Sequence, residues 1–129
     1  MTRAEQMATD PVVFVVEDDA AVRTALALLL KQYDFNVKTY DSAENFLESY
    51  EQTESACLVS DILMPGMSGM DLLITLKRQG CTLPVVLYSG LADSAVVTEA
   101  TKHGAIAVLE KPVRACALRD AVLKALRSA

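Results

Sequence analysis

Several short apolar runs in this chain are followed directly by polar residues that carry charge or offer hydrogen bonds. Carboxylates that lie close together repel one another, and a hard divalent cation such as Mg²⁺ relieves that repulsion. An ammonium and a hydroxyl beside such a cation suit an incoming phosphoryl group, and an aspartate there can act as the nucleophile. The residues that end or follow the runs are, in chain order, Glu17, Asp18, Asp61, Ser89 and Lys111.

These residues can act together only if the runs form neighbouring strands that point the same way. The runs 12–16, 56–60, 85–89 and 106–109 are short and rich in Val, Leu and Ile, which is typical of parallel strands buried on both faces. The segment 35–40 mixes polar and apolar residues and is predicted to be an edge strand. Since the carboxyl ends of parallel strands meet at one edge of a sheet, the polar residues are expected to converge there.

Segments with helical spacing of apolar residues separate these strands. Asp19 is placed to cap the first helix, and Ser68 with Asp71 resembles a capping box for the third. Further helices are expected over 93–103 and from about residue 115. Five strands alternating with five helices predict an α/β protein, a flavodoxin-like (βα)5 three-layer sandwich whose five-stranded parallel sheet has the order 2-1-3-4-5. The residues expected on the apolar face of the first helix are Val22, Leu26, Leu29, Leu30 and Tyr33.

Composition limits the class of protein. The 129 residues, 52% of them hydrophobic, suit one globular domain, predicted over 11–129 after a flexible N-terminal extension over 1–10. The net charge of −5 argues against nucleic-acid contact by this domain. Three widely spaced cysteines argue against a disulfide framework, and no apolar run could span a membrane or serve as a secretory signal. We therefore expect a cytoplasmic protein without membrane contact.

Each candidate residue also has an ordinary structural interpretation. The acidic triplet 17–19 could simply stabilise a helix N-terminus, and Asp61 could form the turn that leads into the Pro-Gly pair after it. Ser89 could be only a strand-end hydroxyl, and Lys111 only a solvated side chain. Their coincidence at the strand ends of one predicted sheet favours phosphoryl transfer over these separate interpretations.

The chain resembles the receiver domains of two-component response regulators from residue 12 to about 127, and SAENFL (42–47) with MPGMSG (64–69) is similar to the receivers of helix-turn-helix transcriptional regulators. This resemblance implies phosphorelay signal transduction, in which a sensor histidine kinase or a phosphotransfer protein phosphorylates the domain and switches a protein-interaction surface. The motifs that carry the resemblance are VVEDD (15–19), SDILMPGMSG (60–69), LYSG (87–90) and LEKP (109–112).

The resemblance also implies how such a domain is used. Transcription would be regulated through an output domain absent from this chain, and the surface over 93–127 could form a homodimer. The domain would be no enzyme beyond its own phosphorylation and dephosphorylation.

Carried over residue by residue, the resemblance implies a Mg²⁺-dependent reaction in which Asp61 is the phosphoacceptor. Ser89 and Lys111 would contact the phosphoryl oxygens, and the Lys111–Pro112 peptide bond would be cis. The groups expected to hold the metal are Asp18, Asp61, the backbone carbonyl of Leu63 and, through a water, Glu17.

Two residues depart from the family pattern near the predicted site. Glu17 stands where Asp is commoner, and its longer arm should still reach a metal-bound water. Val108 stands where the family usually has a switching Phe or Tyr. Tyr88 precedes Ser89 in the strand and should point to the opposite face, so we do not expect it to replace that aromatic.

Leu63 and Leu91 lie two residues after Asp61 and Ser89, respectively. We hypothesise that these leucines restrict the attacking water and slow loss of the phosphoryl group. The alternative is ordinary packing of the two loops.

Three other functions fit parts of the pattern. An aspartyl-phosphate phosphatase of the dehalogenase type usually has a second acid two residues after the nucleophile, where this chain has Leu63. A flavin-binding flavodoxin-like protein needs a Ser/Thr/Gly phosphate cradle after the first strand, where 17–19 is acidic. A receiver-like interaction module without phosphorylation is disfavoured by the complete set of acids, hydroxyl and ammonium.

Overall fold

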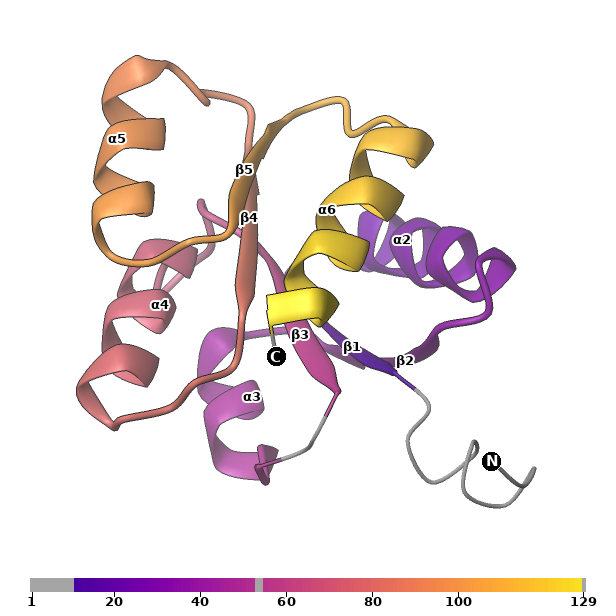
Figure 1. Ribbon diagram of the computed structural model, residues 1–129, viewed down its shortest axis with the longest axis horizontal. Coiled ribbons are helices and arrows are strands. Elements are labelled where there is room, and N and C mark those ends of the chain that lie inside the picture. Colours follow the sequence, from indigo (N-terminus) through magenta and orange to yellow (C-terminus); the bar gives the residue numbers. More distant parts are fainter. Residues whose placement is uncertain (1–10, 53–54, 129) are drawn as a thin grey trace.

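The computed structural model describes residues 11–52 and 55–128, which form a five-stranded parallel sheet between two layers of helices (Figure 1). The strand order β2-β1-β3-β4-β5 confirms the predicted flavodoxin-like topology. The extension expected over 1–10 lies outside the described residues. The elements are β1 (Val12–Val16), α2 (Ala20–Gln32), β2 (Asn36–Tyr40), α3 (Ala43–Ser49), β3 (Ala56–Asp61), α4 (Gly69–Arg78), β4 (Val85–Ser89), α5 (Ser94–Lys102), β5 (Ala107–Glu110) and α6 (Ala115–Ser128).

The central strands are buried on both faces and contribute to two separate cores. Successive strand residues point to opposite faces, so Leu58 packs with the α3–α4–α5 layer while Val59 packs with the α2–α6 layer. Phe46 of α3 belongs to the first core, and Leu30 of α2 and Leu118 of α6 belong to the second. All five side chains are fully buried, which explains why the sequence of β3 is a continuous apolar run.

Local sequence signals set the helix ends. The Asp19 side chain accepts hydrogen bonds from the first turn of α2, and Ser68 and Asp71 form the predicted reciprocal capping box of α4. Gly80 and Gly104 follow α4 and α5 with φ of 73° and 100°, in the left-handed region that ends helices. These caps confirm the helix boundaries expected from the sequence to within about a residue.

Four details differ from the sequence-based predictions, and the first is that β2 begins at Asn36 instead of residue 35. β3 runs one residue further than expected and includes Asp61, because the N–H of Ile62 donates to the carbonyl of Tyr88 (3.0 Å) and extends the pairing of the two strands. β5 is shifted by one residue, to Ala107–Glu110. Val22, expected on the packed face of α2, is 37% exposed.

The polar segment at the sheet edge behaves as predicted, since among the described strands β2 pairs only with β1, and its residues are half-buried or exposed. Within the part of the chain that the structure describes, no helix combines the length and apolar character needed to cross a bilayer.

Candidate functional site

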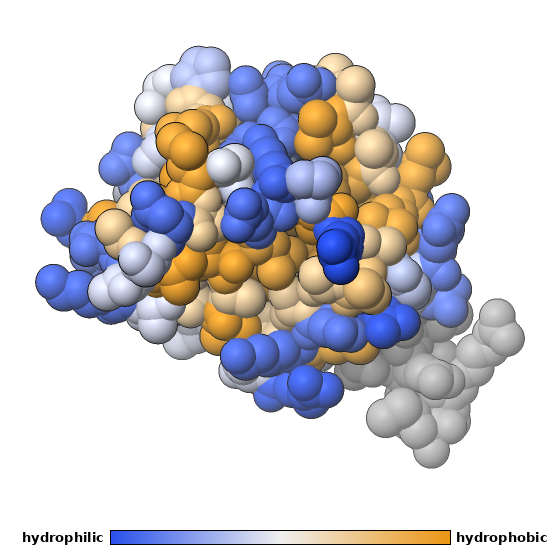
Figure 2. Space-filling model, turned by 90° about the horizontal axis from the view of Figure 1, so that it is seen from above, coloured by the Kyte–Doolittle hydropathy of each residue, from blue (hydrophilic) through white to orange (hydrophobic). Residues whose placement is uncertain are grey.

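The predicted site residues converge at the carboxyl ends of the strands, at the top of Figure 1. The carboxylates of Glu17, Asp18 and Asp61 come from two strand ends and offer oxygens that all lie within 4.8 Å of one another. Figure 2 looks down onto this end of the molecule, where hydrophilic residues gather with hydrophobic surface beside them. The predicted acidic cluster therefore exists in the fold, although its members are far apart in sequence.

Asp61 is a buried carboxylate of this cluster that pairs with a cation. Its carboxylate is only 5% exposed, and Oδ2 accepts a hydrogen bond from Nζ of Lys111 at 2.8 Å. Oδ1 accepts from the backbone N–H of Leu63 at 3.1 Å, so both oxygens have a donor. Burial lowers the pKa of the Lys111 ammonium, but the hydrogen bond and the charge of Asp61 outweigh that effect and leave the pKa raised. Lys111 is therefore a firmly charged partner of Asp61.

Glu17 is a buried carboxylate, 1% exposed, that two donors hold in place. Oε2 accepts from the backbone N–H of Asp19 at 3.0 Å, and Oε1 accepts from the hydroxyl of Tyr88 at 2.8 Å. Burial raises the pKa of Glu17, and the nearby charge of Asp61 adds to the rise although the two hydrogen bonds oppose it. Keeping Glu17 ionised therefore costs free energy, and a bound cation would offset that cost.

Tyr88 is the site residue that sequence reasoning missed. It does lie on the opposite face of the sheet from Ser89, as predicted, because it packs in the α2–α6 core. That same face nevertheless brings Tyr88 to the acidic cluster, since Asp61 is the register partner of Tyr88 and shares that face. The same alternation that places Val59 on this face also places Asp61 there, so strand register was the signal that could have found Tyr88.

Arg23 is a second residue near the site that sequence reasoning missed. Its guanidinium reaches back from α2 and donates from Nη1 to the backbone carbonyl of Glu17 at 2.8 Å. Its position in the first turns of α2, six residues after Glu17, was the only signal in the sequence.

Ser89 is brought to the same sheet end but not into contact with Asp61. Ser89 is buried at the end of β4, where its Oγ accepts from the backbone N–H of Leu91 at 3.0 Å. Within the described residues, no hydrogen bond joins its hydroxyl to Asp61. Its expected contact with phosphoryl oxygens stays a prediction, as does metal binding by the Leu63 carbonyl.

Leu63 and Leu91 rim the site with exposed side chains, 63% and 68% accessible, while their N–H groups bind the Asp61 and Ser89 side chains. This exposure disfavours ordinary loop packing as the reason for the leucines. The Lys111–Pro112 peptide bond is cis, as the family resemblance implied.

The loop after Asp61 packs closely against the carboxyl end of β3. Gly69, the first residue of α4, donates its N–H to the carbonyl of Ile62 at 2.9 Å. A Cβ atom on Gly69 would lie 2.2 Å from the Asp61 carbonyl oxygen, so only glycine fits there without movement. From α3, Glu44 accepts from the N–H of Met67 at 3.4 Å and so reaches the same loop.

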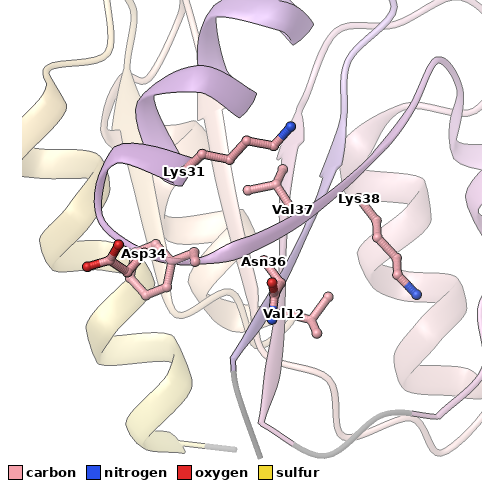
Figure 3. Close-up of a pocket in the computed structure, with 7 residues that line it drawn as sticks. Val12, Lys31, Asp34, Asn36, Val37 and Lys38 are labelled. Atoms are coloured by element: carbon pink, nitrogen blue, oxygen red, sulfur yellow. The ribbon is translucent and has the colours of Figure 1, made fainter. Parts of the chain in front are cut away.

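Of two hollows formed by residues that the structure describes, one adjoins the site. An apolar cavity of about 320 Å³ lies between α2 and the chain after β5 and is lined partly by Val22, Tyr88 and Lys111. A second hollow of about 610 Å³ lies by the amino ends of β1 and β2, at the far end of the sheet. Figure 3 shows that its two lysines, Lys31 and Lys38, point to opposite sides of β2, so they do not converge on one ligand.

The fold and the acidic site define a class of protein that comparison with known sequences identifies. The response regulator receiver domain family matches residues 13–123, and the chain belongs to that family. The transcriptional regulatory protein FixJ of Bradyrhizobium diazoefficiens is 37% identical over 123 residues, which cover 95% of this chain and 60% of that protein. The transcriptional regulatory protein TdiR of Thauera aromatica is 39% identical over 114 residues, covering 88% of this chain and 50% of that protein.

Solved structures agree with this assignment. The crystal structure of FixJ-N superposes with a TM-score of 0.85 at 35% identity and covers 92% of this chain and 94% of that one. The response regulator StyR superposes with a TM-score of 0.85 at 41% identity, covering 92% of this chain but 60% of that one. The chain therefore spans the receiver part, half to 60% of the length, of the curated relatives it matches.

Proposed function

We propose that Asp61 accepts a phosphoryl group from the phosphohistidine of a sensor histidine kinase or a phosphotransfer protein. The observation that carries the proposal is the Asp61 carboxylate itself, which is enclosed between two acidic neighbours and the Lys111 ammonium at 2.8 Å. A carboxylate oxygen of Asp61 forms the new bond to phosphorus, and the phosphorus–nitrogen bond to the imidazole breaks. The electron pair of that bond stays on the imidazole nitrogen, which takes up a proton. Attack by water on the phosphorus later releases inorganic phosphate and restores the aspartate.

The other residues of the chain hold and balance charge during this transfer. Lys111 keeps a positive charge beside the Asp61 oxygen where the phosphoryl group would attach, and Ser89 would donate its hydroxyl to a phosphoryl oxygen. The N–H of Leu63 keeps the other Asp61 oxygen oriented. The domain then acts on no substrate beyond its own phosphoryl group, because Leu63 stands where a phosphatase of the dehalogenase type would place its general acid.

The acidic cluster fits Mg²⁺. It offers carboxylate oxygens without histidine or cysteine, and its outermost member, Asp18, is exposed and so accessible to a hydrated ion. Asp18, Asp61 and the Leu63 carbonyl would hold the ion, with Glu17 acting through a water. A bound Mg²⁺ supplies positive charge that offsets the repulsion among the carboxylates and the phosphoryl oxygens.

Intact mass spectrometry after incubation with acetyl phosphate and MgCl₂ tests this function. We expect one phosphoryl adduct on the wild type, none on Asp61→Asn, and none when EDTA replaces MgCl₂. Asp120→Asn is the matched control, because Asp120 is an exposed aspartate on α6, and it should be phosphorylated like the wild type. An adduct of equal yield on Asp61→Asn, or no Mg²⁺-dependent adduct on the wild type, would overturn the proposal.

Phosphorylation would change a surface to which other proteins bind. The relatives named above are transcriptional regulators, so we propose that this receiver controls transcription through an output domain joined to it. The face formed by α5, β5 and α6 (93–127) is the surface we assign to homodimer formation. Sedimentation velocity with and without acetyl phosphate tests the dimer, which should form only in the phosphorylated sample.

A further inference from the structure

We propose that Tyr88 is a positioning residue that holds the Glu17 carboxylate ready for Mg²⁺, an inference that rests on the function proposed above. Tyr88 is 1% exposed, and its hydroxyl donates to Oε1 of Glu17 at 2.8 Å. The two residues are 71 positions apart in sequence, and they meet because β1, β3 and β4 are neighbours in the sheet. This contact has no counterpart among the site roles implied by the receiver resemblance.

Glutamate at position 17 creates the need for such a tether. A glutamate has one more rotatable bond than an aspartate, so its carboxylate can adopt more positions and loses more rotamer freedom when it is fixed. In this chain the N–H of Asp19 holds Oε2 at 3.0 Å and the hydroxyl of Tyr88 holds Oε1. Without Tyr88 the carboxylate would keep a single tether and would no longer be fixed toward Asp18 and Asp61.

Tyr88 also touches the cationic side of the site. The Nζ atom of Lys111 lies 5.3 Å from the centre of the Tyr88 ring, within the range of a cation–π contact. The same Nζ donates to Asp61 at 2.8 Å. One buried side chain thus contacts both a carboxylate of the metal cluster and the lysine beside the phosphoacceptor, so its ring and its hydroxyl can be tested separately.

Tyr88→Phe removes the hydroxyl and keeps the ring, its packing and its contact with Lys111. We expect Mg²⁺ affinity, measured from backbone amide NMR shifts during MgCl₂ titration, to fall by about tenfold, as is typical when a partner of a metal ligand is removed. Phosphorylation by acetyl phosphate should be slow at low MgCl₂ and should recover to the wild-type rate at saturating MgCl₂, which loss of stability alone would not produce. Tyr33→Phe, the same chemical change at the C-cap of α2, should leave affinity unchanged.

A double-mutant cycle separates this role from a general effect on the fold. In a Glu17→Gln background, Tyr88→Phe should change Mg²⁺ affinity by less than about twofold, because the carboxylate on which Tyr88 acts is gone. Wild-type affinity in Tyr88→Phe, or an equal loss in both backgrounds, would overturn the role of Tyr88. Failure of the wild type itself to bind Mg²⁺ would instead overturn the proposed function, so the two failures are distinguishable.

Discussion

Gly69→Ala is a substitution for which helix propensity and packing predict opposite results. Alanine in a helix interior is more stable than glycine by about 1 kcal/mol, so propensity alone predicts a more stable α4. The structure argues against this, because the new Cβ would lie 2.2 Å from the carbonyl oxygen of Asp61 and 3.0 Å from Cα of Ile62. Both of these atoms belong to the backbone, so no side-chain rotation can relieve the overlap.

The cost of this steric overlap exceeds the gain in helix propensity. Real Cβ contacts stay beyond 3.0 Å, so the Asp61 carbonyl and α4 must separate by most of an ångström. Overpacking of this kind costs about 1–3 kcal/mol, and the strained position is the start of the helix, where the propensity gain is smallest. We expect a net loss of about 1–2 kcal/mol and a Tm lower by about 3–10 °C. Because the displaced residue is the proposed phosphoacceptor, its phosphorylation rate should also fall by about tenfold or more.

Urea unfolding and calorimetry measure the stability loss, and intact mass against time with acetyl phosphate measures the rate. Gly90→Ala is the matched control for stability, because a Cβ there would meet no atom within 4 Å and the residue has no positive φ. It should unfold within about 0.5 kcal/mol of the wild type. A Gly69→Ala protein as stable as the wild type or more stable would refute the packing argument.

Three further expectations test other parts of the structure. Leu63→Asn and Leu91→Glu should each shorten the phosphoryl lifetime several-fold, since these exposed side chains rim the site; unchanged decay of the adduct would remove the proposed shielding. Burial raises the pKa of Glu17, so the folded state binds that proton more tightly than the unfolded chain, and stability from this group is lost as pH rises through the folded-state pKa. Glu17→Gln should therefore gain stability over the wild type near pH 7 without metal and lose that advantage near pH 4, as urea titrations at both pH values would show. Leu58→Ala should cost about 2–5 kcal/mol because its side chain is fully buried, whereas Leu28→Ala, 59% exposed, should cost less than about 0.5 kcal/mol in the same unfolding assay.

The fold was predictable because its signals are local and repeated. Continuous apolar runs such as 56–60 indicated doubly buried parallel strands, and the rule of right-handed crossovers left few possible strand orders. Caps such as Ser68 with Asp71 fixed helix ends to within about a residue. The bounds of β5 were harder, because Ile106 is as apolar as the strand residues and only pairing with β4 decides where the strand begins.

The position of the site was predictable, but its connections were not. The acids and Lys111 could be placed because every parallel strand ends at the same edge of the sheet. The Tyr88–Glu17 hydrogen bond joins residues 71 positions apart. It depends on how β1 and β4 each align with β3, which no local pattern encodes. Arg23 was missed because a surface arginine in a first helical turn resembles many solvated ones.

Different residues connect the site with the two helical layers, and this follows from the alternation of side chains along β4. Ser89 continues the face of Leu87, toward the α3–α4–α5 layer, whereas Tyr88 packs into the α2–α6 layer. Val108 packs against the first layer, and a β-branched aliphatic side chain cannot offer the inward and outward rotamers of an aromatic. The Lys111 ammonium contacts both the Asp61 carboxylate and the Tyr88 ring, and it therefore links Asp61 with the α2–α6 layer. Ser89, whose hydroxyl accepts from the N–H of Leu91, lies toward the other layer, on the face where Val108 stands in place of an aromatic.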